Sequence, residues 1–71
     1  MKELSFEELE KLIEEKKHDR TWSRVVGFYY KLTGEEHLTK PEKWRVLNSL
    51  VKALMKRGYL LSNEVILKLL R

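Results

Sequence analysis

The chain has 71 residues, with 15 lysine and arginine side chains against 11 acidic ones, a net charge of +4, and no cysteine. This length suits one hydrophobic core, and the lack of cysteine excludes disulfides, thiolate metal sites and thiol nucleophiles. Hydrophobic residues make up 42% of the sequence, which excludes the composition typical of intrinsic disorder. The sequence therefore predicts a single folded domain, residues 1–71.

The positive charge is unevenly distributed along the chain. Residues 1–19 hold four lysines against six glutamates and Asp19, a net charge of −3, so residues 20–71 carry +7. No apolar run is long enough for a membrane span, and the N-terminal residues are acidic rather than apolar. We therefore expect a soluble, intracellular (cytoplasmic) protein with no signal peptide, no transmembrane segment and no membrane association.

Hydrophobic periodicity predicts four helices, at about residues 5–17, 22–33, 40–57 and 62–71. At the start of the first helix, Ser5 and Glu8 have capping-box spacing, in which each side chain accepts a hydrogen bond from the other residue's backbone N–H. The apolar side chains of the second helix span about 200° of its circumference, so we expect burial on most sides. Gly34 is expected to end this helix in a left-handed conformation.

The third predicted helix has the same features at its start, because Thr39 and Glu42 repeat the capping-box spacing. Its apolar arc is as wide as that of the second helix, so we expect it to be the central helix. Gly58 is expected to end it, and a tight connection over residues 58–62 leads to the fourth helix. Ser62 should cap that helix, which has little polar surface.

These elements predict an all-α fold, a compact four-helix array or bundle without an internal repeat. Short connections favour packing between helices that are neighbours in the sequence. The expected core draws on all four helices and consists of Phe6, Leu9, Ile13, Trp22, Val25, Val26, Tyr29, Trp44, Leu47, Leu50, Val51, Leu54 and Ile66.

The sequence lacks the residue patterns of catalytic, cofactor and metal sites. His18 and His37 are far apart, and a metal site built on them would need Asp19 or Glu36 as a further ligand. The three glycines are isolated and match no phosphate-binding loop. We therefore expect no enzymatic activity, no cofactor and no metal ion.

One polar strip of the third helix is a candidate binding surface. Its residues fall within about 60° of one another on a helix, and the strip contains no acidic side chain. It consists of Arg45, Ser49, Lys52 and Lys56. Arginine, lysine and serine on one exposed face are the side chains that contact phosphates, so the strip predicts binding of nucleic acid or of an acidic protein surface. A second candidate set, near or on the second helix, is Arg20, Arg24 and Lys31.

Two alternative interpretations remain open at this stage. The well-capped helix starts agree with the rules used for designed proteins, so a designed or redesigned helical scaffold without an evolved function is one alternative. The other alternative is a protein–protein interaction or dimerisation module, because an exposed part of the apolar fourth helix would form a partner surface. We expect a monomer, with a homodimer through the fourth helix as the other possible state.

Overall fold

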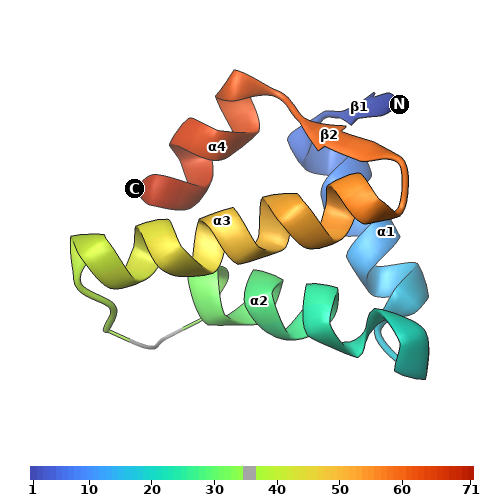
Figure 1. Cartoon of the computed structure of the whole chain (residues 1–71), viewed down its shortest axis with the longest axis horizontal. Helices are drawn as coiled ribbons and strands as arrows, with labels where there is room; N and C mark the ends of the chain where they lie inside the picture. The colour runs from blue at the N-terminus through green and yellow to red at the C-terminus, as the bar shows by residue number, and fades with distance from the viewer. Residues whose placement is uncertain (35–36) are drawn as a thin grey trace.

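Helices form most of the structure, which is a computed structural model that describes residues 1–34 and 37–71. Its elements in chain order are β1 (Lys2–Leu4), α1 (Phe6–Lys16), the 3-10 helix η1 (Arg20–Trp22), α2 (Ser23–Thr33), α3 (Lys40–Lys56), β2 (Tyr59–Leu61) and α4 (Asn63–Leu70). The four expected α-helices are all present, and they pack into a globule of 28 × 25 × 20 Å (Figure 1).

A pair of short strands makes the all-α prediction incomplete. Strands β1 and β2 are parallel, with Lys2 opposite Tyr59 and Leu4 opposite Leu61 (Figure 1). The Lys2 N–H donates to the Gly58 carbonyl at 3.0 Å, which extends the pairing by one residue. Residues 58–62 were expected to form only a tight connection. They contain strand β2, which pairs with the N-terminal strand β1. Three-residue strands are too short to show the alternation by which strands are recognised in a sequence.

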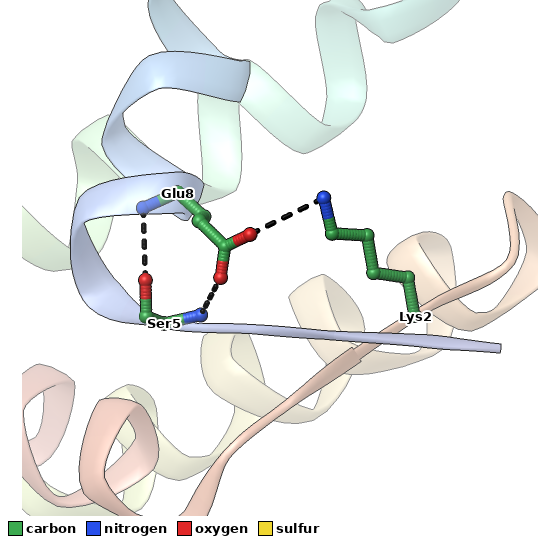
Figure 2. Close-up of polar contacts among 3 residues, drawn as sticks. All are labelled: Lys2, Ser5 and Glu8. Carbon is green, nitrogen blue, oxygen red and sulfur yellow. Dashed lines mark hydrogen bonds and ion pairs between the residues drawn. The ribbon is translucent and has the colours of Figure 1, made fainter.

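The capping box at the start of α1 is confirmed. The Glu8 N–H donates to the Ser5 Oγ at 3.2 Å, and the Ser5 N–H donates to the Glu8 Oε1 at 3.0 Å (Figure 2). Strand β1 adds a cation, because the Lys2 Nζ lies 3.2 Å from the Glu8 Oε2. The hydrogen bond from the Ser5 backbone, helped by Lys2, lowers the pKa of the Glu8 carboxyl below its ordinary value.

The starts of α3 and α4 follow the sequence prediction as well. Thr39 and Glu42 form the second capping box, in which the Glu42 N–H donates to the Thr39 Oγ1 at 3.3 Å. Ser62 caps α4, since its Oγ accepts from the Val65 N–H at 3.3 Å. The start of α2 differs, because Asp19 caps η1 through the Thr21 N–H at 2.9 Å and α2 itself has no side-chain cap.

The two helix-ending glycines play different roles. Gly58 has φ +86°, the left-handed conformation expected after α3. Gly34 has φ −79° and ψ −171°, so the left-handed conformation expected there is wrong. A Cβ at Gly34 would lie 2.6 Å from the Tyr30 carbonyl oxygen. Glycine is therefore needed at residue 34 by close approach of the backbone and not by a positive φ.

Helix α3 packs against α2, β2 and α4 (Figure 1). The buried side chains come from β1 and all four helices: Leu4, Leu9, Leu12, Ile13, Val25, Val26, Tyr29, Leu32, Leu47, Leu50, Leu54, Val65 and Leu69. Four residues of the expected core, Phe6, Trp22, Val51 and Ile66, are only partly buried against it. Trp44 was wrongly placed in the core, since 51% of it is exposed. It lies in the first turns of α3, at the edge of the face that carries Leu47, where Lys40, Lys43 and Leu70 surround it.

Candidate anion-binding groove

A groove with several cationic side chains runs between α2 and the C-terminal half of α3. It encloses about 370 Å³. It is lined by Arg24 and Phe28 of α2, by Ser49, Lys52, Ala53 and Lys56 of α3, and by Arg57 at the end of α3. Four of these residues are cationic and none is acidic, so the groove presents a positive surface beside a small apolar area.

Arg57 is held in place by the protein itself. Its Nη1 donates to the Ala53 carbonyl at 3.0 Å, and its Nη2 donates to the Thr21 carbonyl. The guanidinium carbon also lies 5.0 Å from the centre of the Trp22 ring, within the range of a cation–π contact. Arg57 therefore contributes charge to the groove, while its donors mainly fasten the end of α3 to η1.

The other three cations, Arg24, Lys52 and Lys56, are exposed. Within residues 1–34 and 37–71, none of the three forms an ion pair. Their donors are thus available to an anion, and they lie on two helices whose packing fixes the width of the groove. Ser49 offers less, because its hydroxyl already donates to the Arg45 carbonyl at 3.0 Å.

The structure divides the two sets of candidate residues predicted from the sequence. It brings Arg24 of the second set together with Ser49, Lys52 and Lys56 of the first, all in one groove. Arg45 and Lys31 lie instead in a separate, smaller pocket of about 240 Å³. Arg20 lies on η1 and lines neither of these pockets.

The pocket that contains Arg45 and Lys31 also contains a carboxylate, Glu42. Hydrogen bonds from Thr39 lower the pKa of Glu42, and the charges of Lys31 and Arg45 lower it further. Glu42 therefore stays ionised near neutral pH and offsets part of the positive charge there. An anion would meet less attraction at this end of α3 than in the groove near Lys52.

Sequence reasoning missed Phe28, Ala53 and Arg57 as parts of the groove. Phe28 follows Arg24 by four residues and so shares its face of α2, a spacing that could have been noticed. Arg57 gave no such signal, because its position depends on the packing of α3 against η1.

The described residues contain no arrangement suited to metal binding. No group of three or more His, Cys, Asp or Glu side chains lies close enough to hold an ion in the part of the chain that the structure covers. Glu36, considered as a ligand from the sequence, lies outside the described residues. Among the helices described, none is long and apolar enough to cross a bilayer.

Comparisons with known proteins add no functional information. No family model, no curated protein and no solved structure matches the chain.

Proposed function

We propose that the protein is a non-catalytic helical module that binds nucleic acid through the phosphates. The observation that supports this most directly is the α2–α3 groove, in which Arg24, Lys52, Lys56 and Arg57 gather without an acidic side chain. Nucleic-acid backbones carry regularly spaced negative charges, and lysine and arginine side chains are their usual contacts.

The types of side chain in the groove favour binding that depends little on nucleotide sequence. Lys52 and Lys56 are four residues apart and lie on one face of α3, where they can contact neighbouring phosphates. Arg24 faces them from α2, and its planar guanidinium can donate two hydrogen bonds to one phosphate. These contacts carry no direct information about the bases, so discrimination among sequences should be small.

A titration of the whole chain tests this proposal. Fluorescently labelled single-stranded and duplex DNA and RNA are titrated at two salt concentrations, with anisotropy as the readout. If three phosphates are neutralised, the affinity should fall about sixfold for duplexes and about fourfold for single strands at each doubling of the salt concentration. The absence of binding to all four nucleic acids at low salt would contradict the proposal.

Charge-reversal variants locate the binding surface. Lys52→Glu should weaken binding about tenfold or more, because it places a carboxylate among the remaining cations. Lys40→Glu is the matched control: it makes the same change of net charge at the other end of α3, outside the groove. Equal losses in the two variants would show that overall charge, and not the groove, governs binding.

Two other outcomes separate the alternative functions. Binding to polyglutamate but to no nucleic acid would indicate an acidic protein partner for the same groove.

Dimerisation through α4 is favoured by one observation, since Leu67 is 60% exposed on that helix. Sedimentation at several protein concentrations measures it, and a monomer throughout would exclude the homodimer. A monomer that binds neither polymer and unfolds only at very high temperature would favour the designed scaffold.

A further inference from the structure

The part of the chain that the structure describes has two exposed aromatic side chains, Tyr30 and Trp44. Their surroundings carry opposite charge. The pocket that Tyr30 lines contains one lysine and three carboxylates, from Lys11, Glu7, Glu10 and Glu14. The pocket beside Trp44 encloses about 220 Å³ and is lined by Lys40, Lys43 and Leu70, with no acidic side chain. Trp44 is therefore the exposed aromatic ring that a polyanion can approach without repulsion.

The two lysines beside Trp44 differ in what they contact. The Lys43 Nζ donates to the Arg71 carbonyl at 3.2 Å. Lys40 forms no ion pair within residues 1–34 and 37–71. The surroundings of the ring are thus positive, and one ammonium group there remains available to a ligand.

Trp44 also shares a row of α3 with the lysines of the basic groove. Side chains four residues apart form a row along a helix. Four exposed residues of α3 follow one another in this way: Trp44, Asn48, Lys52 and Lys56. We call them the Trp44 row. None of them is acidic, and Lys52 lies about 12 Å from Trp44 along the helix axis. A chain of phosphates held at Lys52 and Lys56 would therefore reach Trp44 within a few nucleotides.

The Trp44 row connects two sides of α3. In Figure 1, α2 lies below α3 and α4 lies above it. The basic groove is on the α2 side, whereas the pocket beside Trp44 includes Leu70 of α4. A row of this spacing runs obliquely around a helix, so it crosses the exposed surface of α3 from one side towards the other. A ligand that contacts both ends must bend over α3, and a flexible single strand does so more readily than a stiff duplex.

We infer that the protein prefers single-stranded nucleic acid, in which one unpaired base stacks on the Trp44 indole while adjoining phosphates contact Lys52 and Lys56. This inference rests on the proposed nucleic-acid binding and names the class of nucleic acid that is bound. Stacking on aromatic side chains is a main source of affinity for single strands, and it needs no particular base. The bases of a duplex are already stacked on one another, so a duplex gains nothing from Trp44. Asn48 lies between the base and the phosphates, and its amide can donate to the strand.

Intrinsic fluorescence tests the inference on the whole chain. The sequence has two tryptophans, so the Trp22→Phe variant is used, in which the emission comes from Trp44 and an aromatic ring still faces Arg57. It is titrated at low salt with an oligothymidine of about ten nucleotides, an abasic strand of the same length and a duplex of the same length. The abasic strand carries the same phosphates as the oligothymidine but no bases.

Oligothymidine should quench the Trp44 emission and bind about tenfold more tightly than the abasic strand, because only oligothymidine supplies a base to the ring. The duplex should bind more weakly than oligothymidine and leave the emission nearly unchanged. Equal affinity for oligothymidine and the abasic strand, tighter binding of the duplex, or binding of oligothymidine without quenching would overturn the inference. Any of these results would leave binding through the phosphates intact. If none of the probes binds, the proposed function itself is wrong, and the inference with it.

Substitutions at Trp44, measured by anisotropy with labelled strands, separate stacking from a structural role. Trp44→Leu should lower the affinity for oligothymidine about tenfold, to that of the abasic strand, and leave the affinity for the abasic strand unchanged. Trp44→Tyr keeps an aromatic ring and should retain most of the affinity. A disturbed fold would weaken the binding of both strands alike. Equal losses for the two strands in Trp44→Leu, or equal losses in Trp44→Leu and Trp44→Tyr, would contradict stacking on this ring.

Tyr30→Leu is the matched control, because it removes the other exposed aromatic ring, which lies beside carboxylates. It should leave the affinity for oligothymidine nearly unchanged, and a loss as large as that of Trp44→Leu would count against the inference. Lys40→Glu should weaken oligothymidine binding less than Lys52→Glu does, because it adds a carboxylate beside one base and not among the phosphates.

Discussion

The two strand–helix units of the fold, β1 with α1 and β2 with α4, are built from similar sequence. Their strands pair in parallel, so that Leu4 lies opposite Leu61 and each strand leads directly into a capping serine. The same register, an offset of 57 residues, aligns identical residues: Leu4 with Leu61, Ser5 with Ser62, Glu7 with Glu64, Lys11 with Lys68 and Leu12 with Leu69. The two segments therefore share a serine cap and an amphipathic pattern, and each leads from a short strand into a helix.

The units differ most at the third helical residue. In α1 this residue is Glu8, which completes the capping box and contacts Lys2 at the surface (Figure 2). In α4 it is Val65, which is 0% exposed. The serine cap alone suffices where the first turn packs into the core, while the turn near solvent adds a carboxylate. The same local motif thus takes a different third residue according to what surrounds it.

Exchanging the third residues should have the largest and most unequal effects. Val65→Glu places a carboxylate in the core and should destabilise the protein by about 4 kcal/mol or unfold it. Glu8→Val removes half of an exposed capping box and should cost much less, because the carboxylate lies in solvent and the Ser5 hydroxyl still caps the helix. Urea unfolding followed by circular dichroism measures both changes.

A smaller substitution checks this result if Val65→Glu does not fold. Val65→Ala should cost about 2 kcal/mol, because it leaves a cavity at a fully buried position. A loss for Val65→Ala no larger than that for Glu8→Val would contradict the idea that burial distinguishes the two units.

The paired leucines of the strands should also respond unequally. Leu4 is 2% exposed, whereas Leu61 is only partly buried. We expect Leu4→Ala to cost about 3 kcal/mol and Leu61→Ala about half as much, because less apolar surface leaves the core. Chemical denaturation gives both values. Equal losses would mean that strand pairing, which involves both residues, contributes more to the free energy of unfolding than their difference in burial.

Local signals were enough to predict most of the helical fold. Ser5, Thr39 and Ser62 act within a single helical turn, so their caps were recognisable from spacing. The strand pair was not, because it joins segments 57 residues apart. Trp44 was misplaced since its exposure depends on where the neighbouring helices end, which helical periodicity does not reveal.

The candidate site shows the same limit. Spacing on a single helix grouped Lys52 with Lys56 and also with Arg45, yet the groove includes the first two and not the third. Arg24 joins them because α2 packs against α3, and that contact is tertiary. Residues on one helix face were predictable from the sequence, whereas the partners that turn a face into a groove were not.

The smallest expected effect is on the pH dependence of stability, which should differ between the cap of α1 and the cap of α4. The pKa of Glu8 is lowered in the folded protein, chiefly by the hydrogen bond from the Ser5 backbone, so its contribution to stability is present above the ordinary value of 4.5. It is lost as the pH falls through the lower, folded-state pKa. The difference in unfolding free energy between the wild type and Glu8→Gln should therefore shrink as the pH falls from about 6 to about 3.

The α4 cap supplies the control for this pH experiment. It consists of the Ser62 hydroxyl and the Val65 N–H, neither of which titrates in this range. Ser62→Ala should cost about 1 kcal/mol. That cost should be the same at each pH in urea titrations. Asp19 and Glu42 also have lowered pKa values, so the wild type and every variant should lose stability in acid. The quantity to compare is therefore the difference in unfolding free energy between the wild type and each variant at the same pH. A constant difference for Glu8→Gln across the pH range would show that its carboxylate acts only as a hydrogen-bond acceptor, which glutamine replaces.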